Sequence, residues 1–430
     1  MERIQIPKGT FDILPYGEDE PWQLTSLWRY AEEIIRKTAA DYGFSEIRTP
    51  VLERTELFAR GVGETSDIVM KEMFTFQDRG GRSLSLRPEG TAAVMRAYVE
   101  HNFSNLGPVH KLFYLAPMFR YERPQSGRYR QHHQFGVEAI GVASPAQDAE
   151  VIDLLYETYR RLGLKDLSVQ LNSVGDVASR ASFRAALQAY LRPFFNELSE
   201  DSKNRFERNP LRILDSKDQK DKEILTGAPS ILKFLTPEAQ EHFDQLRAIL
   251  DSLNVPYVVN DRIVRGLDYY DKTVFEVTAN VLGAQNSVGA GGRYDGLIAD
   301  FGGPDAPGVG FGTGIERVLQ TLIQQKAKLP EKKGPFIFFL ALGDEAKRLI
   351  FPVAARLRRQ EIPVEVDLHA KKIQAGLQNA VRCSAQFCVL IGSDELEKRI
   401  AQVKNLETRC QEEVPFDRLE QVLEDCWRKK

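Results

Sequence analysis

The chain has 430 residues, of which 42% are hydrophobic and 28% charged, and its formal net charge is −3 at pH 7. A chain of this length is too long to fold around one hydrophobic core, so we expect two or three domains of a soluble globular protein. The small negative charge excludes a surface that is basic all over, although nucleic acid could still bind at a local patch.

No sign of secretion, membrane insertion or a structural metal is present in the sequence. The start, Met1 to Ile4, lacks the apolar core of a signal peptide. The most apolar run, residues 336–340, is too short to cross a bilayer and predicts a buried strand. We expect reduced thiols, a cytoplasmic location and no metal site formed by the protein alone. The cysteines, which form no Cys-x-x-Cys pair, are Cys383, Cys388, Cys410 and Cys426.

The first predicted elements are a helix and a strand. Apolar residues recur at helical spacing over 19–42, and Gly43 follows as a stop signal. Residues 46–52 then predict a strand that ends near Pro50. Ordinary core packing also produces an amphipathic helix before a strand, so this pair alone leaves the function open.

A long antiparallel hairpin is predicted next, with strands at 111–122 and 132–141. Arg120 and Glu122 alternate along the first strand and would share one face, where they could simply form an ion pair. The loop between the strands carries more cations than a plain connection needs. Its polar residues are Arg123, Gln125, Arg128 and Arg130.

Two acidic residues are candidates for a binding site, and the first of them, Glu138, lies among apolar neighbours. Glu138 follows Gln134 on the second hairpin strand by an even number of residues, so both side chains should share one face. A carboxyl in such surroundings is costly unless it is partnered. Glu89 lies in Arg-Pro-Glu-Gly-Thr, residues 87–91, and the capped start of a helix explains this segment as well.

The middle of the chain changes character. Residues 173–255 are charged and helical in pattern, which predicts an insertion into the sheet, and the polar stretch 214–223 predicts a surface loop within it. Strands resume at 257–260 and 273–278. A Gly/Pro-rich turn at 302–310 then leads into a helix that begins near residue 316.

A charged linker at 326–334 separates a first domain, 1–325, from a second, 335–430. Beyond the linker, strands and helices alternate, and the alternation predicts a small α/β domain with a mainly parallel sheet. The predicted order is strand 336–342, helix 345–360, strand 363–368, helix 371–381 and strand 387–392.

Gly310 to Arg317 alternates glycines and then begins a helix with Glu-Arg. It lacks the Gly-Lys-Ser/Thr ending of a phosphate loop and does not match Gly-x-Gly-x-x-Gly with a downstream acid. A glycine strand packed against its neighbour remains the simple alternative.

Two clusters carry the densest chemistry. They are Arg-Gly-Leu-Asp-Tyr-Tyr at 265–270 and Gly-Gly-Arg-Tyr-Asp-Gly-Leu at 291–297. Guanidinium groups suit a carboxylate or phosphate, phenols suit a ring nitrogen, and glycines permit close backbone approach.

These clusters resemble the two histidine-binding motifs of the histidyl-tRNA synthetases. The helix–strand pair at 19–52, the segment 119–125 and the segment 310–317 resemble motifs 1, 2 and 3 of class II aminoacyl-tRNA synthetases. Residues 7–12 and 209–215 also resemble bacterial members. The resemblance spans nearly the whole chain. It implies an α+β fold: an antiparallel six-stranded sheet with flanking helices, a helical insertion and a C-terminal α/β anticodon-binding domain.

The resemblance also implies a reaction: ATP-dependent activation of L-histidine and its transfer to the 3′ end of tRNA(His). It implies a cytoplasmic homodimer that binds no membrane and takes Mg²⁺ with ATP. Catalytic roles would fall to Arg265 and Arg120, and acceptor-end contacts to Arg123 and Gln125. The ATP-binding residues would be Arg120, Glu122, Arg128, His132 and Arg317. The histidine-binding residues would be Glu89, Thr91, Gln134, Glu138, Arg265, Tyr269, Tyr270 and Tyr294.

His132 departs from the family, which usually has Phe at this position to stack on adenine. An unperturbed imidazole titrates between about pH 5.5 and 7.5. Two alternatives to the ligase remain. One is a non-aminoacylating regulatory paralogue that senses histidine for histidine biosynthesis; such relatives usually lack the C-terminal domain and parts of the histidine motifs. The other is a class II synthetase for another amino acid, which only the histidine motifs and Glu138 oppose.

Overall fold

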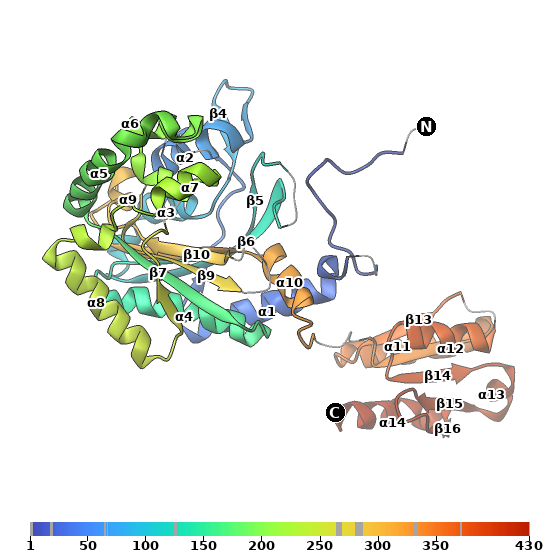
Figure 1. The fold of residues 1–430 in the computed structure, drawn as a ribbon. Helices are drawn as coiled ribbons and strands as arrows, with labels where there is room; N and C mark the ends of the chain where they lie inside the picture. The colour runs from blue at the N-terminus through green and yellow to red at the C-terminus, as the bar shows by residue number, and fades with distance from the viewer. Residues whose placement is uncertain are drawn as a thin grey trace. The chain divides into compact units, whose positions relative to one another are not determined.

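In the computed structural model of the chain, the described residues are 3–17, 20–63, 66, 68–123, 127–263, 269–279, 287–329, 334–369 and 372–429. They form two compact units, Met1–Leu329 and Pro330–Lys430 (Figure 1). Within the described ranges, no helix combines the length and apolar character that crossing a bilayer requires.

The first unit is built on an eight-stranded sheet in the order β1-β5-β6-β11-β10-β9-β7-β8. Its six central strands pair antiparallel, as predicted. The short strands β1 and β8 add parallel pairings at the two edges, so the predicted count of six was too low. The bounds are β1 (Ser45–Glu46), β5 (His110–Phe119), β6 (Gln131–Ile140), β7 (Leu167–Gly175), β8 (Tyr257–Val259), β9 (Asp271–Ala279), β10 (Ser287–Arg293) and β11 (Gly308–Gly314).

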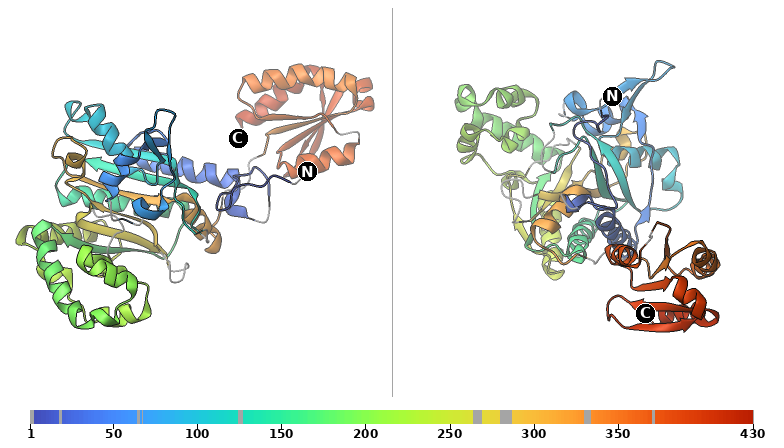
Figure 2. Two further views of the ribbon diagram at one scale, coloured as in Figure 1. Left: turned by 90° about the horizontal axis from the view of Figure 1, so that it is seen from above. Right: turned by 90° about the vertical axis from the view of Figure 1, so that its right-hand side faces the viewer.

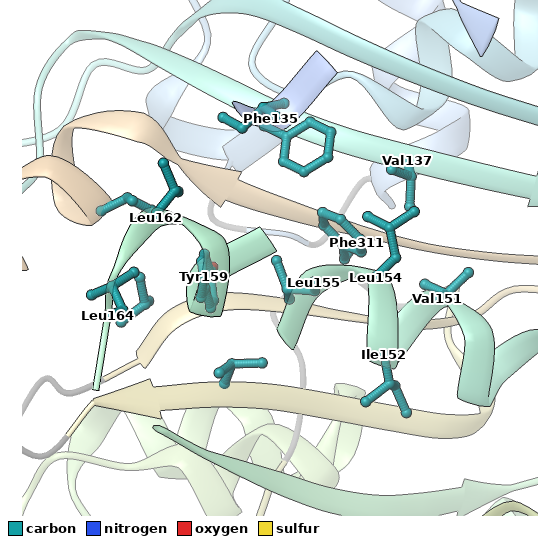
Figure 3. Close-up of a cluster of buried hydrophobic side chains, with 14 of the residues drawn as sticks. Phe135, Val137, Val151, Ile152, Leu154, Leu155, Tyr159, Leu162, Leu164 and Phe311 are labelled. Atoms are coloured by element: carbon teal, nitrogen blue, oxygen red, sulfur yellow. The ribbon is translucent and has the colours of Figure 1, made fainter. Parts of the chain in front are cut away.

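Helices cover both faces of this sheet (Figure 1). One face packs against the amphipathic α1 and the helices α4, α8 and α10, and Figure 3 shows side chains of α4 reaching β6 and β11. The other face packs against α3 and α9, with α2 beyond them. The bounds are η1 (Pro21–Gln23), α1 (Thr25–Asp41), α2 (Thr55–Val62), η2 (Ile68–Glu72), α3 (Thr91–Glu100), η3 (Phe103–Asn105), α4 (Pro145–Leu162), α8 (Pro237–Ser252), α9 (Leu297–Asp300) and α10 (Ile315–Gln324).

The single strand predicted at 46–52 was wrong. The chain leaves the large sheet after β1 and enters a three-stranded sheet, ordered β2 (Leu52–Arg54), β4 (Ser83–Leu86), β3 (Thr75–Gln77). At the crossing, the buried guanidinium of Arg87 donates to the carbonyls of Thr49 at 2.8 Å and Pro50 at 3.3 Å. Because Pro50 has no N–H and these carbonyls bond to Arg87, the segment does not continue a ladder.

The predicted helical insertion divides into two parts. Helices α5 to α7 share their own core and form a cluster at one side of the unit in both views of Figure 2, whereas α8 belongs to the core beneath the large sheet. The bounds are α5 (Val177–Leu191), η4 (Arg192–Glu197), α6 (Glu200–Arg208), η5 (Pro210–Asp215), α7 (Gln219–Leu225) and η6 (Ile231–Phe234).

The stretch 214–223 lies mostly at the surface, as predicted, but only part of it is a loop. It enters α7, and Asp221 within it is fully buried. The hydroxyls of Ser199, Ser202 and Ser216 donate to Asp221 Oδ2 at 2.6–2.7 Å. These hydrogen bonds satisfy the carboxylate, so one charged side chain of a mostly exposed stretch is buried.

The second unit has a five-stranded sheet in the order β13-β12-β14-β15-β16. The predicted alternation forms the parallel strands β13, β12 and β14, but β15 and β16 are antiparallel, so half of the pairings depart from a parallel sheet. Helices lie on both faces (Figure 2). The bounds are β12 (Ile337–Ala341), α11 (Asp344–Arg359), β13 (Val364–Asp367), α12 (Ile373–Arg382), β14 (Phe387–Ile391), α13 (Ser393–Lys398), β15 (Ile400–Asn405), β16 (Gln411–Pro415) and α14 (Phe416–Arg428).

Candidate active site

Strand alternation gives β6 one apolar and one polar face. Phe135 and Val137 point toward α4 (Figure 3). Gln134 and Glu138 therefore project from the other face, as predicted from their even spacing. On β11, Phe311 follows the same rule and packs against Phe135 with ring centroids 5.2 Å apart.

The glycines of β11 make room for these polar side chains. Gly310 pairs with Glu138, and a Cβ added at Gly310 would collide with Glu138 Oε2. A Cβ at Gly312 would collide with the amide of Gln134. The alternating glycines therefore serve a site and not only strand packing.

Glu138 is 1% exposed, yet it is fully partnered. The Thr91 hydroxyl donates to Oε1 at 2.8 Å, and the Tyr294 hydroxyl donates to Oε2. Burial raises the pKa of Glu138 to about 8; the neighbouring charge of Glu89 adds to the rise, and the two hydroxyl donors oppose it. The carboxyl can therefore gain or lose a proton near neutral pH, when a ligand arrives.

Glu89 precedes Gly90, the N-cap of helix α3, and its side chain bonds to the first turn. Its two oxygens accept from the backbone N–H groups of Thr91 at 2.7 Å and Ala92 at 2.9 Å, the arrangement that its sequence context favoured. Burial raises its pKa, and the backbone donors oppose the rise. Glu89 and Thr91 both line a cavity of about 230 Å³. The cavity also contacts Arg120, His132, Gln134, Tyr269, Tyr270, Ala290, Tyr294, Gly310, Phe311, Gly312 and Gly314.

Three tyrosines form one side of this cavity. The ring of Tyr269 lies 4.7 Å from that of Tyr270 and 5.7 Å from that of Tyr294 between centroids. Burial raises the pKa of both Tyr269 and Tyr294 well above the ordinary value. The phenols therefore stay protonated and can donate hydrogen bonds.

Arg120 enters the cavity from beyond the end of β5. The strand stops at Phe119, so the predicted arrangement of Arg120 and Glu122 on one strand face was wrong. The Arg120 N–H donates to Arg130 O at 2.9 Å, and its Nε donates to Pro88 O at 2.8 Å. These two bonds fix the guanidinium where it can meet an anion.

A second group of charges gathers beside Arg120. Arg128 Nη1 lies 3.1 Å from Glu122 Oε2, and Arg317 Nη1 donates to Ser287 O at 2.7 Å. Arg317 also lies against Gly127, where an added Cβ would be 3.2 Å from its Nε. Burial lowers the pKa of Arg317, and the charge of Arg128 adds to the effect. The fold thus brings residues of the hairpin loop and α10 together.

The comparison with protein families decides the family. Residues 23–318 match the model described as "Histidyl-tRNA synthetase", and residues 337–425 match the "Anticodon binding domain". The chain belongs to the histidyl-tRNA synthetases. It is therefore a class II aminoacyl-tRNA synthetase, and the reaction of the family is the ATP-dependent ligation of histidine to tRNA.

Individual relatives cover both units of this histidyl-tRNA synthetase chain. The histidine–tRNA ligase of Protochlamydia amoebophila is 55% identical over 423 residues, 98% of this chain and 100% of the relative. That of Desulfitobacterium hafniense is 49% identical over 98% of this chain and 97% of the relative. The apo S. aureus histidyl-tRNA synthetase has a TM-score of 0.82 and 38% identity, covering 98% and 100% of the two chains. Ligases thus match both units, and a regulatory paralogue is not favoured.

His132, the position that departs from the family, lines the cavity. Burial lowers the pKa of its imidazole to about 3, and the nearby charges of Arg120 and His133 act in the same direction. The ring is therefore neutral throughout pH 5.5–7.5, the range in which an unperturbed imidazole would change its charge.

The substitution His132→Phe should lower the ATP KM a few-fold without changing turnover, because a larger apolar ring stacks better on adenine. Since His132 is neutral above about pH 3, the benefit should be the same at pH 5.5 and pH 7.5. Steady-state kinetics at both values measures it. An ATP KM equal to that of the wild type at both would show that this side chain does not stack on the base.

Some of the predicted site lies outside the described residues, including Arg265 and Gln125. Arg123 is described and exposed in the hairpin loop. The sequence analysis missed Glu316, which is 1% exposed and accepts from the His133 N–H at 2.7 Å and from its ring Nδ1 at 2.9 Å. Glu316 directly precedes Arg317 in the sequence, and this position could have indicated a place near the site, but a role was predicted only for Arg317.

Proposed function

We propose that the chain carries out the reaction of its family in the cavity beside β6 and β11. The observation that carries this proposal is the environment of Glu138. Its buried carboxyl, held between Thr91 and Tyr294, adjoins a cavity that also contains Arg120. A carboxyl of raised pKa next to a fixed cation suits a ligand with a titratable ring and an anionic group.

Glu138 binds one nitrogen of the histidine imidazole in this proposal, and Tyr270 binds the other, with Tyr269 and Tyr294 beside them. Imidazole presents nitrogens on opposite edges, so a carboxyl and a phenol test both. Gln134 contacts the substrate from the same face of β6. Glu89 and Thr91 receive the α-amino group; the Thr91 oxygen donates its proton to Glu138 and can still accept from an ammonium.

The first reaction step joins the two substrates. The histidine carboxylate attacks the α-phosphorus of ATP, a P–O bond forms, and pyrophosphate leaves. Arg120 and Arg265 stabilise the charge that develops on the α-phosphate. Glu122 and Arg128 bind the nucleotide, and Arg317 and His132 contact its base and phosphates.

The second step transfers histidine. A hydroxyl of the terminal tRNA ribose attacks the carbonyl carbon of histidyl-adenylate, and AMP leaves. Arg123 and Gln125, in the loop that follows Arg120, contact the acceptor end of tRNA(His) in this proposal. The exposure of Arg123 is compatible with that role.

Mg²⁺ enters the proposal only together with ATP. Within the described ranges, no three His, Cys, Asp or Glu side chains are grouped so as to hold a metal ion. The cavity carboxyls Glu89 and Glu138 already accept from N–H and O–H donors. The cavity side chains do not fit a protein-held Mg²⁺. When bound with ATP, the ion neutralises phosphate charge.

We also propose a cytoplasmic homodimer that contacts through the motif 1 region. Two apolar side chains there, Val51 at 37% and Leu52 at 45% exposure, lie at and beside the edge strand β2 and suit a partner surface. Light scattering should give twice the mass of one chain.

ATP–pyrophosphate exchange, screened over twenty amino acids, tests the proposed function. Exchange should require histidine and respond scarcely to the others, because a substrate without imidazole leaves Glu138 without its partner. Equal exchange with another amino acid would refute the assignment of the site to histidine.

A chain ending at Leu329 should retain histidine-dependent exchange and charge tRNA(His) poorly. The first unit keeps its own core, whereas the unit that matches the anticodon-binding family is removed. Filter assays of charged tRNA, run beside exchange assays, compare the two activities. Undiminished charging by the shortened chain would contradict an anticodon role for residues 330–430.

A further inference from the structure

The buried Arg293 occupies a position that the proposed function does not use. It is 0% exposed at the end of β10, and each of its five N–H groups has an acceptor. Nε and Nη2 donate to Asp148, Nη1 donates to Val142 O at 3.1 Å and Asp295 Oδ1 at 2.9 Å, and Nη2 also donates to Ser144 O at 3.3 Å. The side chain thus joins the ends of β6 and β10 to the first turn of α4.

The residue after Arg293 belongs to the cavity. Successive side chains of an extended segment point to opposite faces, so Arg293 reaches toward α4 while Tyr294 reaches the cavity. Tyr294 N–H donates to Gly308 O at 2.7 Å, and Asp295 Oδ1 accepts from Gly308 N–H at 3.3 Å as well as from Arg293. A Cβ at Gly308 would collide with the Tyr294 ring. The position of Arg293 therefore determines where the Tyr294 ring packs against Gly308, at the start of β11.

Asp148 and Arg293 are enclosed by further polar and charged groups. Asp148 is 0% exposed, and His242 on α8 has its Nε2 at 3.8 Å from Asp148 Oδ2. Burial lowers the pKa of His242, so the ring stays neutral near neutral pH. Lys272 Nζ lies 3.9 Å from Asp295 Oδ2. Asp148 and Arg293 are both 0% exposed, so removing the charge of one would leave the other buried without its partner.

We infer that Asp148 and Arg293 are positioning residues for histidine recognition, acting through Tyr294 on the carboxyl of Glu138. The inference rests on the role proposed above for Glu138. The Tyr294 hydroxyl holds one oxygen of Glu138, and Thr91 holds the other. A shift of Tyr294 would therefore turn the carboxyl away from the imidazole. Among the described residues, the hydrogen bonds of Asp148 go to Arg293 and reach none of the ATP contacts on the hairpin loop or α10.

The experiment is ATP–pyrophosphate exchange with wild type, Asp148→Asn, Tyr294→Phe and the double variant. Asp148→Asn should raise the histidine KM about tenfold and change the ATP KM less than about twofold. Its preference for histidine over thiazolylalanine, an analogue with one ring nitrogen, should fall. In the Tyr294→Phe background, Asp148→Asn should add almost nothing, because the route to Glu138 is already lost. If the fold-increases in histidine KM of the two single variants multiply in the double variant, the inference is overturned.

Tyr159→Phe is the matched control. It also removes a buried hydrogen bond between α4 and β11, from Tyr159 to Thr313 at 2.7 Å, but this bond involves neither Arg293 nor Tyr294 nor Glu138. Its histidine KM should equal that of the wild type. A rise as large as that of Asp148→Asn would mean that any loss of a buried hydrogen bond on α4 weakens histidine binding, and would contradict a specific role of Asp148. Arg293→Lys, which keeps the charge but loses the fork, gives the second measurement if Asp148→Asn melts below the assay temperature.

The proposed function and the positioning role of Asp148 and Arg293 are contradicted by different results. Wild-type exchange that does not depend on histidine would overturn the proposed function, and the inference with it. Histidine-dependent exchange with an unchanged histidine KM in both Asp148→Asn and Arg293→Lys would overturn the inference alone.

Discussion

Glu138→Gln should lower kcat/KM for histidine by about 10²-fold or more, because an amide cannot replace a carboxyl that exchanges a proton with imidazole. The same change should stabilise the protein without substrate. Burial raises the pKa of Glu138 to about 8 from an ordinary 4.5, so the unfolded chain releases this proton at a lower pH than the folded one. Glu138 therefore costs stability increasingly as pH rises from about 4.5 to about 8.

Urea unfolding at pH 5 and pH 8 measures that cost. The gain in unfolding free energy of Glu138→Gln over wild type should be small at pH 5 and reach the order of a few kcal/mol at pH 8. The exposed Glu241 on α8 provides the control, since Glu241→Gln should give the same small difference at both values. A gain that shrinks toward pH 8 would mean that the carboxyl is ionised in the free protein.

Arg120→Gln should reduce the rate of histidine activation by roughly 10²-fold or more while changing histidine binding far less. One preorganised donor at a developing charge contributes about 3–4 kcal/mol. The bond from Nε to Pro88 O holds this guanidinium before any ligand arrives, and the bond from the main-chain N–H to Arg130 O holds its backbone, so little reorganisation is needed. We expect Arg265→His to show the same pattern of kinetics.

Single-turnover formation of histidyl-adenylate, measured beside histidine binding by calorimetry, separates the two effects for Arg120. The exposed Arg79 supplies a variant, Arg79→Gln, with the same loss of charge away from the cavity, and it should react at the wild-type rate. A raised histidine dissociation constant with an unchanged rate would make Arg120 a binding residue only.

Much of the fold could be predicted because local patterns and tertiary structure agree. The alternation of Gln134 and Glu138 against Phe135 and Val137 determines both faces of β6 from the sequence alone. The family resemblance supplied what alternation cannot, namely that strands distant in sequence meet in one sheet. The strand predicted at 257–260 forms as β8 at Tyr257–Val259, although the six-stranded sheet that was expected had no place for it. The other edge strand, β1, has two residues, too few for a periodic pattern to form.

The failures share a physical cause: they depend on partners distant in sequence. Asp221 appeared to be a loop residue because its serine partners at 199 and 202 lie in another helix. The low pKa of His132 depends on enclosure by the cavity and the charge of Arg120. Arg293 was quoted within a motif, but its partner Asp148 lies 145 residues away in the chain, and no spacing rule connects the two.

The glycines beneath the cavity restrict how this enzyme can evolve. Added Cβ atoms at Gly291 and Gly292 would collide with main-chain oxygens of Gly310 and Thr273, and those at Gly310 and Gly312 with Val137 O and the Gln134 amide. None of these four has the left-handed backbone that requires glycine for conformational reasons, so the requirement is spatial. At Gly291, Gly292 and Gly310, where the obstacle is a main-chain oxygen, a point mutation cannot add a side chain without moving the backbone; at Gly312 the flexible Gln134 side chain would have to move. Any drift toward another amino acid has to begin among the polar and aromatic side chains above these glycines.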